Sequence, residues 1–152
     1  MSEAAYADAP YFAYGSNTDP TRMVERCPGS QVLGPAYVAG YALAFGGPSR
    51  LWQGGVATLQ PATGQARVPG ILFRVPPATL DALDRIEGHP YFYVRRPLEV
   101  STDNGEVMAF TYLLQDGIPQ VPVSPRYLEA LLGAYRLHAW DSSALQSLKE
   151  GA

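Results

Sequence analysis

A glutamate lies on the apolar face of a short helix that the sequence predicts between Pro76 and Gly88. Proline suits the first turn of a helix, and glycine suits the left-handed position just after its end. Leu80, Leu83 and Glu87 follow the i, i+3, i+7 spacing of one helix face, so the Glu87 carboxylate is expected to face the core. Burial and the negative end of the helix dipole would then both raise its pKa. The alternative is a frayed last turn in which Glu87 points into water.

A carboxyl group of raised pKa is what a general acid or base needs near pH 7, so Glu87 is the candidate catalytic residue. Asp81 and Asp84 lie off the apolar stripe and are expected to be solvated. Glu99 lies on the polar face of a later predicted strand, where it is a candidate for a second polar group in a cavity. Arg95 is on the same face and is expected to pair with Glu99 or to bind a substrate carboxylate.

Composition and charge limit the partners. The net charge is −3 and Lys and Arg form no runs, which disfavours nucleic acid and anionic membranes. No apolar run approaches the ~20 residues of a membrane span, and no signal peptide is visible. The single cysteine, Cys27, cannot form an internal disulfide, which favours a cytoplasmic location. Cys27, His89 and His138 lack metal-ligand spacing, so no metal site is expected.

The pattern of elements predicts one domain of the α+β class over residues 11–152, preceded by a flexible lead-in over residues 1–10. Short alternating or apolar segments bounded by turn residues predict strands at 11–14, 37–46, 54–59, 68–75, 92–100 and 107–114. Ser124 followed by Pro125 predicts the start of a helix, and a last short helix is expected from 142 or 143 to 149. We expect a small, mixed, curved, barrel-like β-sheet with short flanking helices.

The turn Gly15-Ser16-Asn17 follows the first predicted strand and precedes a short helix with Pro20 at its first position. Backbone N–H groups at such a junction make a site for an anion or an oxyanion without any charged side chain. The alternative is an ordinary turn without a ligand.

Four segments, taken in order, resemble the γ-glutamylcyclotransferase family. They are 11–17 (YFAYGSN), 52–58 (WQGGVAT), 83–88 (LDRIEG) with Tyr93 after it, and 124–127 (SPRY). The resemblance runs from about residue 11 to residue 132 and is lost after Leu137. It implies a mixed β-barrel fold, no cofactor, and release of 5-oxoproline from a small γ-glutamyl substrate, with the protein a monomer or a homodimer.

The resemblance also implies roles for particular residues. Glu87 matches the catalytic glutamate, and Tyr127 matches a substrate-binding tyrosine. Tyr93 is expected to line the same cavity. The segment that holds the γ-glutamyl group matches Tyr11, Phe12, Ala13, Tyr14, Gly15 and Ser16.

Two rival functions are weighed against this one. An amidase would use Ser16 as nucleophile and His89 as base, although the turn lacks the Gly-x-Ser-x-Gly pattern. A non-catalytic module would bind a γ-glutamyl or amino-acid ligand in the same cavity. A binder of a carboxylate-bearing ligand gains nothing from an acid at position 87, which argues against the second rival.

Overall fold

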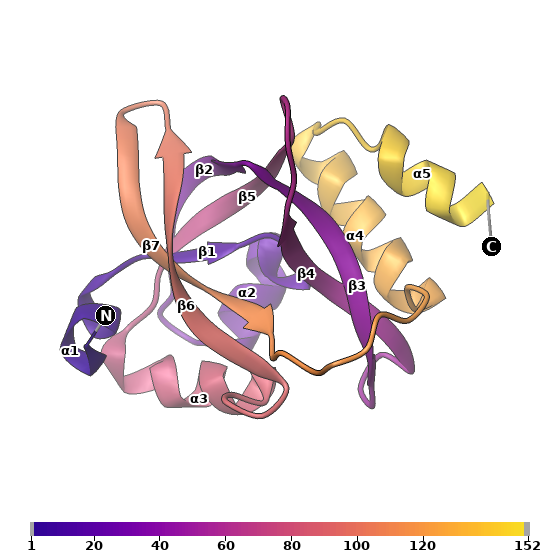
Figure 1. Ribbon diagram of the computed structural model, residues 1–152. Helices are drawn as coiled ribbons and strands as arrows, with labels where there is room; N and C mark the ends of the chain where they lie inside the picture. The colour runs from indigo at the N-terminus through magenta and orange to yellow at the C-terminus, as the bar shows by residue number, and fades with distance from the viewer. Residues whose placement is uncertain (1, 151–152) are drawn as a thin grey trace.

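A closed five-stranded barrel and a two-stranded sheet beside it form the framework of the computed structural model, which describes residues 2–150 (Figure 1). The barrel order is β1-β5-β2-β6-β7, and its closing pair, β1 with β7, is parallel. Its strands are β1 (Tyr11–Ala13), β2 (Gln31–Ala39), β5 (Arg67–Arg74), β6 (Tyr93–Thr102) and β7 (Gly105–Leu114). The separate sheet pairs β3 (Tyr41–Ser49) with β4 (Gly54–Pro61). The predicted α+β class with a small barrel-like sheet is confirmed.

Short helices flank these strands, with α3 and α4 on different sides of the barrel (Figure 1). Their bounds are α1 (Glu3–Asp8), α2 (Pro20–Arg26), α3 (Pro77–Glu87), α4 (Pro125–His138) and α5 (Ser143–Glu150), with the 3-10 turn η1 (Ser16–Thr18) before α2. The caps follow the sequence: Asp19 and Ser124 each accept a backbone N–H in the first turn of α2 and α4. Within residues 2–150, no helix has the length and apolar character needed to cross a membrane.

Strand β1 divides the core into two clusters because its successive side chains point to opposite faces. Phe12 packs with the cluster that α4 covers, together with Leu131 and Leu132. Tyr11 and Ala13 belong to the second cluster, which includes Leu80 and Leu83 of α3. One face of β1 therefore packs in the cluster that contains α4 residues, and the other face packs in the cluster that contains α3 residues. Both helices contribute to the pocket described below.

The β3–β4 hairpin is attached to the segment that leads into α4. Gly55 donates its N–H to Pro122 O at 3.0 Å, and its carbonyl accepts from Ser124 N at 2.9 Å. The Ser124 hydroxyl donates to Trp52 O at 2.6 Å. These bonds hold the tip of the hairpin close to the first turn of α4.

Two features differ from the sequence prediction. The segment 37–46 is not one strand, because Gly40 has a φ of +81° and ends β2 before β3 begins in a different sheet. Residues 3–8 form helix α1, where a flexible lead-in was expected over residues 1–10. The Ser2 side chain caps α1, and Tyr6 packs its ring edge-on against Phe110 at 5.9 Å. Met1 lies outside the described residues.

Candidate active site

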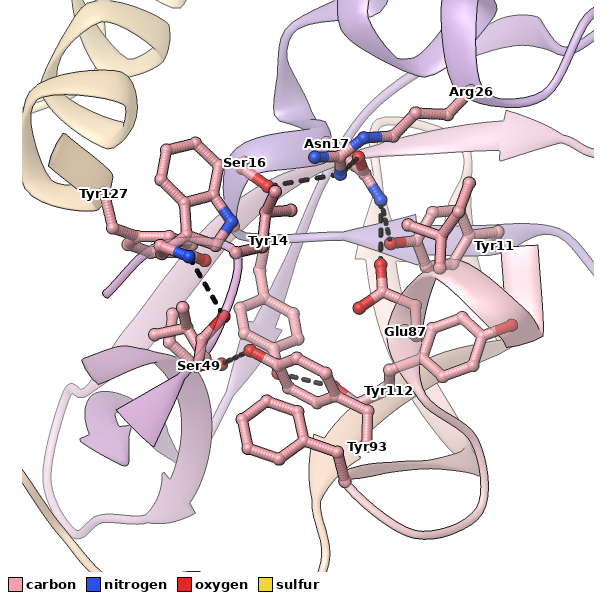
Figure 2. A pocket seen from close by; sticks show the side chains of 17 residues that line it. Tyr11, Tyr14, Ser16, Asn17, Arg26, Ser49, Glu87, Tyr93, Tyr112 and Tyr127 are labelled. Atoms are coloured by element: carbon pink, nitrogen blue, oxygen red, sulfur yellow. Dashed lines mark hydrogen bonds between the residues drawn. The ribbon is translucent and has the colours of Figure 1, made fainter. Parts of the chain in front are cut away.

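A pocket of about 90 Å³ opens between the C-terminal end of α3, the turn after β1, the β3–β4 hairpin and the first turn of α4 (Figure 2). Its polar lining includes Tyr11, Ser16, Asn17, Arg26, Ser49, Glu87, Tyr93, Tyr112 and Tyr127. Its large apolar lining includes Leu51, Trp52, Val56, Ile86 and Phe92. Among the described lining residues, Arg26 and Glu87 are the charged ones.

Glu87 is the last residue of α3, and Gly88 follows it in the left-handed conformation with a φ of +73°. Leu80 and Leu83 on the same stripe are buried, so the helix end is held against the core and does not fray into solvent. The Glu87 carboxyl lines the pocket, and burial raises its pKa from the ordinary 4.5 to about 7. The predicted orientation and the predicted direction of the pKa shift are both confirmed.

Asn17 joins Glu87 to the start of the chain. Its Nδ2 donates to Glu87 Oε1 at 3.1 Å and lies 3.1 Å from the Tyr11 hydroxyl oxygen. Its Oδ1 accepts from Arg26 at 2.6 Å, which fixes the amide with its NH₂ group toward Glu87. The Arg26 charge and the Asn17 hydrogen bond both favour the ionised carboxylate, so they limit the rise in the Glu87 pKa.

Tyrosines from several elements line the pocket: Tyr14 follows β1, Tyr93 is on β6 and Tyr127 is on α4. Tyr93 donates its hydroxyl to Ala57 O at 2.5 Å, and Tyr14 donates to Tyr112 O at 2.5 Å. The Tyr127 hydroxyl lies so close to Gly15 that a Cβ at position 15 would overlap it. Burial raises the pKa of Tyr127, while backbone hydrogen bonds at Ala57 and Ser16 oppose that rise. Backbone groups of Ser16 and Ala57 therefore lie beside the Tyr127 hydroxyl.

Asp84 lies behind Glu87 and is not solvated as expected. Its Oδ1 accepts from the Tyr112 hydroxyl at 2.6 Å and pairs with Arg95 Nε at 3.2 Å. The sequence places Asp84 off the apolar stripe of its own helix, but residues from β6 and β7 cover it. Its negative charge adds a further, smaller rise to the pKa of Glu87.

The expectations for Glu99 and its partner are wrong. The inside–outside alternation of β6 is interrupted between Arg95 and Leu98, where two exposed residues follow one another. As a result, Arg95 is buried and Glu99 is exposed. Glu99 lies outside the pocket beside Glu106, whose hydrogen bond raises the Glu99 pKa. Arg95 pairs with Asp84 instead. Asp81 is exposed, as expected.

The structure brings most of the predicted site residues together. Those that line the pocket are Tyr11, Tyr14, Gly15, Ser16, Glu87, Tyr93 and Tyr127. Phe12 and Ala13 do not line it; their side chains are buried in the two core clusters. That any of these residues binds a substrate stays a prediction.

Sequence reasoning missed Asn17 and Arg26 as pocket side chains, along with Tyr112 and Trp52. Asn17 belongs to the turn for which only the backbone N–H groups were considered. Its side-chain amide, a hydrogen-bond donor next to a predicted anion site, was the feature of the sequence that could have indicated its role. Arg26 lies in the last turn of α2, nine positions after Asn17, and nothing in the spacing indicates that the two meet.

The geometry also bears on the amidase alternative. None of the described residues that line the pocket is a histidine. His89 accepts the Arg95 N–H on Nδ1 at 3.1 Å, and the nearest partner of the Ser16 hydroxyl is Arg26 at 3.5 Å. Ser16 and His89 therefore do not form a nucleophile–base pair.

The fold and the site define a class: a small α+β barrel in which a carboxylate of raised pKa faces a tyrosine-lined pocket. Comparison with known proteins gives the family. The model of the family "Gamma-glutamyl cyclotransferase, AIG2-like" matches residues 11–137. This chain belongs to that family, and the resemblance drawn from the sequence motifs is confirmed.

Curated relatives and a solved structure agree with this assignment. The chain is 32% identical over 126 residues to the γ-glutamylcyclotransferase of Bos taurus, covering 80% of this chain and 66% of that protein. It is 31% identical over 122 residues to the Homo sapiens protein of the same name, covering 77% of this chain and 64% of that one. In both cases the match spans just under two thirds of the relative. A solved structure named γ-glutamyl cyclotransferase superposes with a TM-score of 0.81 at 28% identity, over 93% of this chain and 86% of that one.

Proposed function

We propose that this protein is a γ-glutamylcyclotransferase that releases 5-oxoproline from a γ-glutamyl amino acid or amine, with Glu87 as general acid and base. The observation that carries the proposal is the Glu87 carboxyl in the pocket with a pKa of about 7. Such a group exchanges protons readily at neutral pH. Family membership and the γ-glutamylcyclotransferase names of the relatives support the same activity.

The reaction begins with a proton transfer. The ionised Glu87 takes a proton from the substrate's α-ammonium group, and the free amine attacks the γ-carbonyl carbon of the same molecule. A new C–N bond closes the five-membered ring and an oxyanion forms on the former carbonyl oxygen. Because both reactants belong to one molecule, correct folding of the substrate supplies much of the rate: effective molarities of well-oriented cyclisations reach ~10⁵–10⁸ M.

The second half of the reaction returns the proton. Glu87 donates this proton to the nitrogen of the leaving group, the oxyanion collapses to a carbonyl, and the old C–N bond breaks, so that the amine is released. The ring nitrogen still carries the extra proton that it kept in the attack and passes it to Glu87. The departing amine takes that proton from Glu87 and leaves as an ammonium group, so 5-oxoproline is neutral at nitrogen and Glu87 is ionised again. Asn17 and Arg26 hold the carboxylate in place throughout, since the Asn17 amide donates to Glu87 and is itself fixed by Arg26.

Backbone N–H groups of the turn Gly15-Ser16-Asn17 are the proposed site for a negatively charged oxygen of the substrate. The supporting observation is that all three residues of this turn line the pocket together with Glu87. Preorganised donors of this kind stabilise developing charge without reorganisation. The donors act on either the oxyanion or the α-carboxylate.

The direct test is to incubate the purified protein with γ-glutamyl dipeptides and measure 5-oxoproline by chromatography. Glu87→Gln keeps size and hydrogen bonding but cannot accept a proton, so kcat should fall by ~10²–10⁴-fold. Ligand binding should persist in this variant. A non-catalytic binding module would give no 5-oxoproline from the wild type, and near-normal release by Glu87→Gln would place the base elsewhere.

A further inference from the structure

The pocket has an outer apolar part that the cyclisation itself does not use. Leu51, on the tip of the β3–β4 hairpin, and Ile86, next to Glu87 on α3, both line the pocket although they are 61% and 42% exposed. Trp52 and Phe92, both partly buried, lie with them in the lining. Large apolar side chains left in water at the mouth of a site are available to contact a ligand.

We call the outer part formed by Leu51, Trp52, Ile86 and Phe92 the apolar lip. Contacts of Trp52 with neighbouring residues hold its hairpin side in place. Trp52 accepts the Ser124 hydroxyl on its carbonyl at 2.6 Å and packs edge-on against Tyr127 at 5.1 Å. The guanidinium groups of Arg22 and Arg126 lie 5.3 Å and 5.8 Å from the centre of the Trp52 ring. The hairpin tip is therefore anchored to α2 and α4, and Leu51 is presented on a fixed support.

The proposed chemistry places the leaving group at this lip. Glu87 must reach the departing nitrogen, so the leaving group starts beside Glu87 and extends away from the ring that is closing. The charged and amide groups of the lining, Arg26 and Asn17, are bonded to one another on the side of Tyr11 (Figure 2). Ile86 adjoins Glu87 in the chain and Leu51 lines the same pocket from the hairpin, so a leaving group that starts beside Glu87 can contact exposed aliphatic side chains.

We infer that Leu51 and Ile86 form a leaving-group subsite that selects γ-glutamyl conjugates of apolar amino acids or amines, an inference that rests on the proposed function. Contact with the lip removes the leaving group's apolar surface from water together with that of the two side chains. A partly buried aliphatic side chain in such a subsite changes kcat/KM by about tenfold.

Three substrates separate apolarity from size: γ-glutamyl-leucine, γ-glutamyl-asparagine and γ-glutamyl-glycine. Asparagine resembles leucine in shape but is polar, and glycine has no side chain. We expect kcat/KM for the leucine compound to exceed the other two by about tenfold. Equal values for leucine and asparagine, with 5-oxoproline released from both, would overturn the subsite and leave the proposed function standing.

Variants of Leu51 and Ile86 test whether these two side chains cause the preference for the leucine compound. Leu51→Ser and Ile86→Ser should each reduce the leucine-to-asparagine ratio of kcat/KM, and together bring it within about threefold of unity. Leu137→Ser is the matched control, because Leu137 is 63% exposed on α4 and lies outside the lining. The ratio of the kcat/KM values for two substrates, measured on one variant, does not depend on the fraction of enzyme that is folded. An unchanged ratio in the double variant would contradict the inference.

Binding gives a second readout that does not depend on turnover. Titration calorimetry of the three compounds on Glu87→Gln should give the same order of affinity, with the leucine compound tightest. If the wild type released no 5-oxoproline from any of them, the proposed function would fail, and the affinity order would still test the lip. An order with asparagine or glycine tightest would reject the subsite.

Discussion

Asn17 Nδ2 donates to Glu87 Oε1 at 3.1 Å although 70 positions separate the two residues in the chain. The bond joins the turn after β1 to the last residue of α3. Arg26 completes the arrangement by donating to Asn17 Oδ1 at 2.6 Å. The pKa of the proposed catalytic group is therefore set jointly by burial, by an amide and by a guanidinium that does not need to touch it.

Removal of the Arg26 charge should raise the pKa of Glu87 further. The nearby cation favours the ionised carboxylate, so Arg26→Met should move the acid limb of the kcat/KM profile upward by about one pH unit. Arg22→Met is the control, because Arg22 lies one turn earlier on α2 and stacks over Trp52. The measurement is the pH dependence of 5-oxoproline release. A downward shift of the limb, or an equal shift in both variants, would contradict the role given to Arg26.

Glu87→Gln should stabilise the protein above pH 7 and not below pH 4. The folded-state pKa of about 7 lies above the ordinary 4.5, so the native state favours the protonated carboxyl. Wild-type stability is then fully present below 4.5 and falls as the pH rises through 7. The difference between the two pKa values corresponds to at most about 3 kcal/mol of unfolding free energy. The Glu87→Gln variant does not lose this stability at high pH, because glutamine does not ionise.

Urea unfolding at pH 4, 6 and 8 checks this prediction. Asp81→Asn serves as control, since Asp81 is an exposed carboxylate on the same helix and should stay within about 0.5 kcal/mol of the wild type. A Glu87→Gln gain that is the same at all three pH values would show that titration is not its cause.

Gly15→Ala should destabilise the protein, and Tyr127→Phe should relieve the effect. A Cβ on residue 15 would overlap the Tyr127 hydroxyl, whereas the next nearest atom, Tyr127 Cζ, is 3.6 Å away. Forcing a methyl group into such a space costs about 1–3 kcal/mol. Unfolding free energies of the two single variants and the double variant form a cycle. Strictly additive values would mean that Tyr127 moves aside freely.

Ser16→Ala should keep measurable turnover. The proposed stabilisation comes from backbone N–H groups, and the Ser16 hydroxyl makes only a 3.5 Å contact with Arg26. We expect kcat to change by less than about tenfold, compared with ~10²–10⁴-fold for Glu87→Gln. A folded, ligand-binding Ser16→Ala variant without any activity would instead favour the serine as nucleophile.

The parts of the site that could be predicted are those encoded locally. Leu80, Leu83 and Glu87 share a helix face, and Gly88 marks the end of that helix, so Glu87 was found from spacing alone. Asn17 was not paired with Glu87 because their contact depends on how α3 packs beside the turn after β1. Asp84 shows the same limit: its own helix directs it away from the stripe, and β7 supplies the Tyr112 ring that covers it.

The fold shows a similar division. The alternation of large and small residues between 37 and 46 indicates extended chain, which is correct, but it carries no information on which sheet the chain joins. The change of sheet occurs at Gly40, where the left-handed conformation redirects the backbone. Helix α1 was missed because its packing partner Phe110 lies on β7, far along the chain.

The double hydrogen bond of Ser124 has a consequence for protein engineering. Its hydroxyl oxygen accepts the N–H of Tyr127 at 3.2 Å and donates to Trp52 O at 2.6 Å, so one atom fixes both the hairpin and the helix that frame the pocket. Sequence changes at Arg50 and Leu51 leave this anchor intact. The hairpin tip can therefore be diversified in a library to alter substrate choice, while the distance between Tyr127 and the turn at Gly15 is preserved.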